Sequence, residues 1–353
     1  MRIAYFAHLN DGRGSGVISK IASQLEHWRG KGHSVRLFIA TSADDEPWQR
    51  SLGDVVIRRY GGPVSRLIAM TRVVRAVRGF DPELVYMRGQ LFYPPMLWLP
   101  AGAPLVVEVN TDDLKENELS SRIRAIYNAR TRTFLLRRAS ALIFVTAELS
   151  HLPSFNRLPA PRSVISNGID LGAYPQLPAG AQGSPRLVFV GTGDAPWHGV
   201  DKLCMLATIR TDWQIDIVGM RNPRAVSHPN ITWHGPLERG DVLPILARAD
   251  VGIGTLALHR KSMEEASSLK VREYLAVGLP VIYGCSDPDA DGLGPYVLRI
   301  ANTETNVIDE IDRIDAFVQA SRGVRVPRNR VAHIDVAQKE QQRLALFEDL
   351  AGN

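Results

Sequence analysis

Cysteine is nearly absent from the 353-residue sequence, which contains only Cys204 and Cys285. Two cysteines form neither a disulfide framework nor the clustered spacing of a zinc site. We therefore expect two buried thiols in a protein of the reducing cytoplasm. The apolar start, residues 3–7, is too short for the core of a signal peptide and is expected to form a first strand.

Long hydrophobic runs are also missing. The most apolar stretch, residues 91–109, is interrupted by four prolines and a glycine, so we expect no membrane-spanning helix. The composition, 45% hydrophobic and 22% charged, is typical of a globular chain. The length suggests about two domains of roughly 150 residues each.

Acidic residues are scarce in the first half. Residues 1–175 carry 23 Lys and Arg against 15 Asp and Glu, whereas residues 176–353 carry 19 against 22. This asymmetry predicts two domains with different partners. An anionic membrane surface or a phosphorylated lipid acceptor is one interpretation of the basic half. Nucleic acid is a second interpretation, and solvated arginines without a partner are the third.

Strands alternate with helices in the first half, which predicts a largely parallel sheet with ligand-binding loops at the carboxyl ends of its strands. Four polar residues follow such strands and are expected to bind substrate: Arg88, Asn110, Asp112 and Asp113. The pattern predicts strands at 2–7, 34–40, 84–87, 105–110 and 141–146 and helices at 17–28, 64–78 and 118–138.

A glycine-rich loop follows the first predicted strand and contains Gly12, Gly14 and Gly16. Its spacing differs from G-x-G-x-x-G, and no acidic residue ends the second strand, so a dinucleotide site is disfavoured. Gly14 and Gly16 would still let a ligand approach backbone N–H groups beside Arg13. A plain tight turn is the alternative.

The second half repeats the alternation after a segment rich in proline, glycine and alanine, residues 174–185, which predicts a linker. We therefore expect an N-terminal domain over 1–173, a C-terminal domain over 186–330 and a terminal helical segment over 331–353. The pattern predicts strands at 163–170, 186–191, 214–219, 231–235, 250–254, 279–284 and 296–300 and helices at 200–209, 305–321 and 335–350.

The segment at 265–280 gives the sharpest chemical argument. Ser267 or Ser268 is suited to cap a helix whose first turn contains Lys270. A cation there opposes the helix dipole at a cost of about 0.3–1 kcal/mol, unless a diphosphate lies between the ammonium and the free N–H groups. Glu273 lies near the same face and suits a ribose diol. The alternative is a surface Lys270–Glu273 pair.

Seven residues separate Glu265 from Glu273. Four further segments are used in the comparison that follows: Val107-Glu108-Val109-Asn110, Asn167-Gly168-Ile169-Asp170, Phe189-Val190-Gly191 and Ile217-Val218-Gly219. The ordered set resembles the retaining glycosyltransferases of the family 4-like group, which carry an E-x7-E signature. The resemblance implies an α/β protein of GT-B architecture, with two Rossmann-like domains facing across a cleft and a terminal helix that crosses back to the N-terminal domain.

The resemblance also implies a reaction. A sugar would pass from a nucleotide sugar, bound by the second domain, to a glycan, lipid-linked or small-molecule acceptor, bound mostly by the first. The anomeric configuration would be retained. The donor could be a UDP-, GDP- or ADP-sugar, and we expect no cofactor, no metal and no nucleic acid partner. We expect the sugar transfer to take place at the cytoplasmic side of a membrane, in the synthesis of surface polysaccharide or glycoconjugate.

Many family members place an arginine after F-V-G and a lysine before the later glycine, where this chain has Thr192 and His198. The diphosphate must then depend on other cations, first Lys270 and more weakly Arg221 and Arg13. The expected catalytic residues are Glu265 and Lys270. The residues expected to bind the donor are Gly14, Gly16, Gly191, Thr192, His198, Arg221, Ser268, Leu269, Lys270 and Glu273.

Two alternatives to a glycosyltransferase stay open at this point. One is an epimerase or phosphorylase on the same fold. The other is a non-catalytic relative that binds a nucleotide sugar, because the usual arginine and lysine are missing.

Overall fold

The computed structural model describes residues 1–10, 15–44, 49, 51–99, 102–178, 183–191, 195–222 and 228–352. The chain forms two compact units, one of residues 1–166 with 339–353 and one of residues 167–338. The stretch expected as a linker, 174–185, begins inside the second unit, where the Leu177 amide donates to the Val277 carbonyl. The first unit therefore combines residues from both ends of the chain.

The first unit contains a seven-stranded parallel sheet in the order β3-β2-β1-β4-β5-β6-β7. Its central strands are apolar runs buried on both faces, as in other parallel sheets covered by helices. The expected parallel α/β sheet is confirmed. The strands are β1 (Arg2–His8), β2 (Ser34–Thr41), β3 (Val55–Arg59), β4 (Leu84–Arg88), β5 (Leu105–Val109), β6 (Ala141–Phe144) and β7 (Arg162–Val164).

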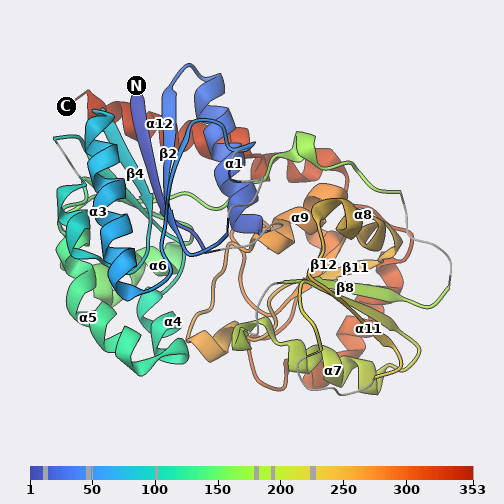
Figure 1. Ribbon diagram of the computed structural model, residues 1–353. Helices are drawn as coiled ribbons and strands as arrows, with labels where there is room; N and C mark the ends of the chain where they lie inside the picture. Colours follow the sequence, from blue (N-terminus) through green and yellow to red (C-terminus); the bar gives the residue numbers. More distant parts are fainter. Residues whose placement is uncertain are drawn as a thin grey trace. The chain divides into compact units, whose positions relative to one another are not determined.

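Helices α1 and α12 pack in one core with this sheet (Figure 1). Trp28 of α1 stacks on Tyr5 at 5.6 Å between ring centroids, and Phe347 of α12 meets Trp28 at 5.3 Å. Aromatic burial therefore holds the last helix onto the first unit. The helical elements of this unit are α1 (Gly16–Gly30), α3 (Pro63–Gly79), η1 (Pro94–Trp98), α4 (Asp113–Ser120), α5 (Arg122–Leu136), α6 (Ala147–His151), η2 (Pro153–Phe155) and, from residue 339 on, α12 (Val336–Ala351).

A buried charge cluster joins three of these elements. Glu108 of β5 accepts hydrogen bonds from Lys20 of α1 and, at 3.2 Å, from Arg343 of α12. Arg343 also pairs with Glu340. Burial alone would raise the pKa of Glu108, yet Lys20 and Arg343 hold it well below its usual range. The cluster is thus an ionised network in which each charge depends on its partners.

The second unit contains a six-stranded parallel sheet in the order β10-β9-β8-β11-β12-β13. Figure 1 shows α8 and α9 on one side of this sheet and α7 and α11 on the other. Its strands are β8 (Arg186–Val190), β9 (Gln214–Val218), β10 (Ile231–Gly235), β11 (Val251–Ile253), β12 (Val281–Tyr283) and β13 (Val297–Arg299). Its helices are η3 (Leu171–Ala173), η4 (Pro196–His198), α7 (Val200–Ile209), α8 (Arg239–Arg248), η5 (Leu258–Lys261), α9 (Leu269–Val277), η6 (Gly294–Tyr296), α10 (Asn306–Asp309), α11 (Ile311–Ser321) and η7 (Arg328–Ile334).

Two predicted helices are wrong in extent. The single helix expected at 118–138 is two helices, α4 and α5, because Ser121 between them has extended backbone (φ −166°, ψ 123°). The helix expected at 305–321 is likewise divided at Glu310 into α10 and α11. The strand expected at 163–170 is confined to 162–164, and β3 was not predicted.

Candidate functional site

The start of α9 is the centre of the candidate site. Ser268 is the N-cap residue, with extended backbone (φ −79°, ψ 125°), but its side chain makes no capping hydrogen bond. The first turn contains no acidic residue. The first N–H groups of this helix therefore have no side-chain cap from Ser268, and they are the kind of donor that binds an anion.

Lys270 lies in this first turn, and its ammonium nitrogen is buried. The nitrogen lies 3.9 Å from the centroid of the Phe189 ring and has no hydrogen-bond partner among the described residues. Burial lowers the pKa of Lys270 to about 7, against the opposing attraction of Glu273. The alternative of an exposed Lys270–Glu273 pair is therefore excluded. A buried cation without an acceptor is suited to receive an anionic ligand.

Glu273, one turn further along α9, has a different partner. Its Oε1 accepts a hydrogen bond of 3.1 Å from the Tyr174 hydroxyl. Burial raises the pKa of Glu273, while Tyr174, Arg239 and Lys270 oppose the rise. The Arg239 guanidinium in turn stacks 3.8 Å from the Tyr174 ring centroid. The carboxylate is thus held in place and keeps acceptor capacity for a ligand hydroxyl.

A buried arginine fixes the start of α9. Arg272 donates to Asp287 at 2.9 Å and to Asp289 at 2.6 Å, and also to the carbonyls of Asn167 at 3.0 Å and Ser268 at 3.2 Å. These bonds tie the first turn to two other segments of the unit. The N-terminal N–H groups are therefore preorganised, which lowers the cost of binding a ligand there.

Glu265 precedes the helix in an extended segment. It forms a parallel bridge with Ser286, and the neighbouring Ala266 amide donates to the Ser286 carbonyl at 2.9 Å. The segment is thus paired with the chain that follows β12. Leu269 is the first residue of α9 and Ser268 is its N-cap. Both residues were predicted to bind the donor, and they directly precede Lys270 in the chain.

The end of β8 meets the turn after β9 at two glycines. Gly219 has a left-handed conformation (φ +96°), and a Cβ on it would lie 2.2 Å from the Gly191 carbonyl oxygen. A Cβ on Gly191 would lie 3.1 Å from the Lys270 ammonium nitrogen. Gly219 therefore requires glycine for close backbone approach, whereas a Cβ on Gly191 would also meet the Phe189 ring at 2.8 Å. The backbone of Gly191 is next to the buried cation.

His198 lies in η4, close to the same cation. Its ring centroid is 5.6 Å from that of Phe189, and its Nδ1 is buried without a hydrogen-bond partner among the described residues. Burial, with repulsion from Lys270 and Lys261, lowers the pKa of His198 to about 3. The imidazole is thus neutral near pH 7. It can donate a hydrogen bond to a ligand but adds no positive charge.

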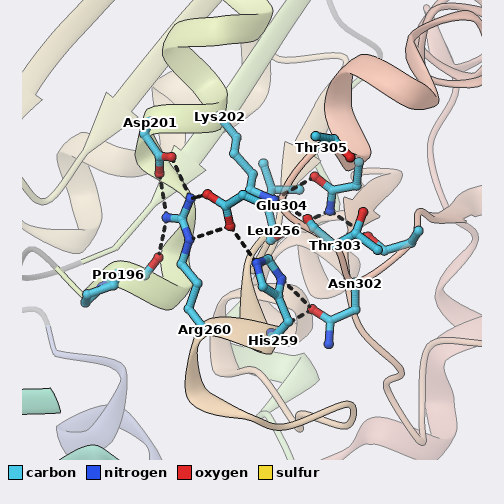
Figure 2. A network of polar contacts seen from close by, with 12 residues as sticks. Pro196, Asp201, Lys202, Leu256, His259, Arg260, Asn302, Thr303, Glu304 and Thr305 are labelled. Carbon is cyan, nitrogen blue, oxygen red and sulfur yellow. Dashed lines mark hydrogen bonds and ion pairs between the residues drawn. The ribbon is translucent and has the colours of Figure 1, made fainter.

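Figure 2 shows the polar network that fixes the segment carrying His198. Arg260 of η5 pairs with Asp201 at the start of α7 and with Glu304, and it also donates to the Pro196 carbonyl at 3.0 Å. His259 contacts Glu304 at 2.7 Å. The Arg260 and His259 side chains hold the pKa of Glu304 well below its usual range. The network therefore braces η4 against η5 and α7.

The remaining predicted donor-site residues are less informative. Arg221 is exposed beyond the end of β9, and Gly16 is the first residue of α1, after the N-cap Ser15. Arg13, Gly14 and Thr192 lie outside the described residues.

A cavity of about 230 Å³ lies in the first unit at the carboxyl ends of β4 and β5. Its walls combine apolar side chains, among them Phe92, Leu136 and Phe155, with polar ones. The Arg88 Nη1 and both polar atoms of the Gln90 amide are buried without hydrogen-bond partners among the described residues. Such groups are costly unless a ligand or water satisfies them. The cavity is therefore a candidate for binding an acceptor.

The other predicted substrate residues have partners within the unit. Asp112 caps α4 by accepting from the Leu114 amide at 3.1 Å, and it does not line the cavity. Asp113 lines the cavity but pairs with Arg132 at 2.7 Å. Asn110 also lines it and accepts from Lys20 at 3.2 Å. Asp112 and Asp113 thus have structural partners that the sequence did not indicate.

No cluster of three or more His, Cys, Asp or Glu side chains among the described residues could hold a metal ion. No helix in the described ranges is long and apolar enough to span a bilayer.

Comparison with known proteins finds a family match in the N-terminal part of the chain. Residues 15–168 match the model of the glycosyl transferase 4-like domain. This part of the chain is similar to a glycosyl transferase 4-like domain. The expected family resemblance is thus confirmed, and family and fold together support a glycosyltransferase. No curated protein matches the chain in sequence.

Solved structures extend the likeness in fold to both units of the chain. Sucrose-phosphate synthase from Thermosynechococcus elongatus has a TM-score of 0.76 and 15% identity, covering 100% of this chain and 99% of its own. Anabaena HepE, in complex with UDP and glucose, has a TM-score of 0.67, 16% identity and coverage of 99% and 100%. The UDP-GlcNAc 2-epimerase from Neisseria meningitidis has a TM-score of 0.59 and 12% identity, covering 99% of this chain and 100% of its own. The GT-B fold with two Rossmann-like domains is confirmed.

Several residues of the candidate site were not predicted from the sequence. Phe189 was read as part of a buried strand, and Tyr174 as part of a linker. Their contacts with Lys270 and Glu273 join segments far apart in sequence, which no local pattern indicates. Gln90 could have been found, because it follows Arg88 and Gly89 at the end of a predicted strand.

Proposed function

We propose that this chain is a retaining glycosyltransferase that moves a hexose from a nucleotide sugar to a glycan, lipid-linked or small-molecule acceptor. The observation that carries the proposal is Lys270, a buried ammonium without a hydrogen-bond acceptor in the first turn of α9. A diphosphate would supply the missing negative charge and accept from the N–H groups of the same turn. The presence of UDP in the HepE structure supports this choice of ligand.

The proposed donor site has a role for each side chain. Lys270 and the backbone of Ser268, Leu269 and Gly191 bind the diphosphate. Glu273 accepts hydrogen bonds from the ribose diol, with its carboxylate oriented by the Tyr174 hydroxyl. Roles for other predicted residues follow in the same proposal: Glu265 contacts the sugar, His198 donates a hydrogen bond, and Thr192, Arg221, Arg13, Gly14 and Gly16 border the donor.

The proposed chemical step breaks the bond between the anomeric carbon and the diphosphate oxygen. The acceptor oxygen forms its bond on the same face of the sugar, and its proton passes to the departing phosphate. Negative charge develops on the leaving diphosphate, where the Lys270 ammonium and the N-terminus of α9 stabilise it. No residue of the chain needs to act as a general base in this step.

The cavity of the first unit is proposed to bind the acceptor. Arg88 and Gln90 would hydrogen-bond its polar groups, and the apolar wall would pack against the rest. Asn110, Asp112 and Asp113 would border or support this site. We place the enzyme at the cytoplasmic face of a membrane, in the synthesis of polysaccharide or glycoconjugate, because its first half is basic.

A thermal-shift screen of nucleoside diphosphates and nucleotide sugars tests the donor. A ligand that binds only the folded protein raises the melting temperature, by an amount that grows with ligand concentration. We expect one base to give a clear shift in the wild type and little shift in Lys270→Met. If no nucleotide shifts the wild-type protein, the proposed donor site is wrong. If a nucleotide sugar does bind and react, proton NMR of the glycoside product tests whether the anomeric configuration is retained.

An epimerase is the second candidate, because the UDP-GlcNAc 2-epimerase shares the fold over nearly the full chain. An epimerase would convert the nucleotide sugar without any acceptor, and the nucleotide would stay attached. A non-catalytic relative would bind the donor and leave it unchanged. Chromatography of the donor after incubation with and without acceptor glycans separates the three outcomes. Release of nucleoside diphosphate that depends on the acceptor supports transfer.

A further inference from the structure

Two helices of the first unit, α3 and α5, carry arginines and no acidic residue. Helix α3 spans Pro63–Gly79 and α5 spans Arg122–Leu136. Each contributes four arginines, and all except the half-buried Arg66 and the buried Arg132 are exposed. Arg137 and Arg138 extend the series just beyond α5 and are also exposed. Exposed basic residues also occur elsewhere in the unit, but α3 and α5 carry theirs in series and without acidic residues between them.

Exposed apolar side chains accompany these arginines at helical spacing. Val64, Leu67 and Ile68 lie on one face of α3, and Val64 is 76% exposed. Ile123, which is 81% exposed, shares its face of α5 with Ile126 and Phe134. Single exposed apolar residues are ordinary, but two such stripes need an explanation.

The two stripes belong to one side of the unit because both helices pack against η1. Arg66 of α3 donates to the Tyr93 hydroxyl, and Tyr127 of α5 donates to the Phe92 carbonyl at 2.8 Å, both just before η1. Trp98, at the end of η1, is 57% exposed. We call the exposed residues of α3, η1 and α5 the basic apolar face; α3 and α5 are labelled in Figure 1.

Arginines continue the apolar stripes along each helix. Arg75 and Arg78 lie about three and four turns beyond Val64, on the same side of α3. Arg130 lies about two turns beyond Ile123 on α5. Each helix therefore presents both apolar groups and guanidinium groups on its exposed side.

We propose that the basic apolar face docks the protein on an anionic phospholipid surface. The aliphatic side chains would enter the boundary between headgroups and acyl chains, while the guanidinium groups pair with lipid phosphates. Trp98 is the residue type that concentrates at this depth. Both attractions act together, since apolar insertion and charge each contribute to interfacial binding. The face belongs to the first unit alone, so the proposal does not depend on sugar transfer.

Two other occupants fit the face less well. A second copy of the chain in a two-fold dimer would bring these helices against themselves, and they have no carboxylate to pair with the facing arginines. A nucleic acid would use the arginines but would leave Val64, Leu67 and Ile123 against a phosphate backbone. A lipid surface satisfies both the charge and the apolar groups.

Vesicle co-sedimentation of the full-length protein tests the proposal. We expect binding to phosphatidylcholine vesicles that contain phosphatidylglycerol and little binding to phosphatidylcholine alone. Replacing Arg75, Arg78 and Arg130 by glutamine should weaken binding about 100-fold, at about fivefold for each charge near the surface. Glutamine preserves helix propensity, so the variant should fold. Ile123→Gln with Phe134→Gln should also weaken binding, with no change in net charge.

A matched control removes three exposed arginines from the second unit: Arg299, Arg313 and Arg330. This control has the same net charge as the triple arginine variant of the basic apolar face, and it should bind vesicles as the wild type does. An equal loss in the control, or no binding of the wild type to either vesicle, overturns the proposal. So does a dimer in light scattering that dissociates in the face variants. Retention on a DNA duplex that Arg75→Gln weakens and Ile123→Gln does not, without vesicle binding, would assign the face to nucleic acid instead.

Discussion

Lys270 is the residue whose surroundings make the strongest chemical demand. Its ammonium faces the Phe189 ring at 3.9 Å and has no hydrogen-bond acceptor among the described residues. Because burial lowers its pKa to about 7, the free protein holds this group only partly protonated at neutral pH. A diphosphate would favour the charged form and raise the pKa again. Binding and protonation of Lys270 are therefore coupled.

This coupling predicts proton uptake on binding. Above pH 7 the free protein has lost the Lys270 proton and the complex regains it, so diphosphate affinity should fall by up to about tenfold per pH unit. Calorimetry of UDP or GDP binding near pH 8, in buffers of different ionisation enthalpy, measures the protons taken up. Lys270→Met should bind weakly and take up none from this site. Unchanged uptake in the variant would contradict the assignment.

The same variant provides its own folding control. The pKa of Lys270 is about 7 in the folded protein and near 10.5 in the unfolded chain. The unfolded chain therefore binds more protons between these values, and Lys270 makes stability rise with pH across that window. Below pH 7 the buried charge destabilises the fold. Lys270→Met should thus melt at a higher temperature than the wild type at pH 6, and the difference should shrink toward pH 10.

At the scale of elements, the junction of β8 and β9 depends on two glycines. A Cβ on Gly219 would lie 2.2 Å from the Gly191 carbonyl oxygen, and the φ of +96° adds strain for any other residue. Gly219→Ala should displace the Gly191 backbone beside Lys270. We expect at least about tenfold weaker nucleotide binding and a destabilisation of about 1–3 kcal/mol. Titration calorimetry and urea unfolding measure the two effects.

Gly240 supplies a matched control for this prediction. It lies in α8, and a Cβ there would have no heavy atom within 4 Å. Gly240→Ala should keep nucleotide affinity and add up to about 1 kcal/mol of stability, because alanine favours the helix. If both alanine variants bind equally well, the close approach at Gly219 has no role in the donor site.

Elements were predictable where the signal was local. The apolar runs around Tyr5 and Val188 gave their strands, and the serines before Leu269 gave the start of α9. The break at Ser121 was not predictable from periodicity, because Asp113 is tied to Asn128 and Arg132 across the break. Such contacts are tertiary and override the helix pattern.

The same limit applies to the candidate site. The positions of Lys270 and Glu273 on one helix followed from spacing in the sequence. Phe189 under the ammonium and Tyr174 on the carboxylate did not, because each contact joins residues about 80 to 100 positions apart. The capping role of Asp112 could have been predicted, because aspartate is a preferred N-cap residue and Asp112 directly precedes α4. Asp112 was assigned to substrate binding instead.

For the whole molecule, the first unit depends on a helix from the far end of the chain. Arg343 of α12 is fully buried and pairs with Glu108 and Glu340. Removing one partner of a buried ionised network leaves an uncompensated charge, which costs about 3–5 kcal/mol. Arg343→Met should therefore destabilise the first unit by about that amount. Methionine resembles the aliphatic part of the arginine side chain, so the loss would come mainly from the missing charge.

Hydrogen exchange read peptide by peptide tests this prediction, because it reports each unit separately. Amides of β1, β4 and β5 should exchange faster in Arg343→Met, while amides of β8 and β11 in the second unit should exchange as in the wild type. Gln342→Met, an exposed change one residue earlier on α12, should leave both patterns unchanged. Equal acceleration in both units would mean that they unfold as one, and no acceleration would mean that α12 contributes little to the first unit.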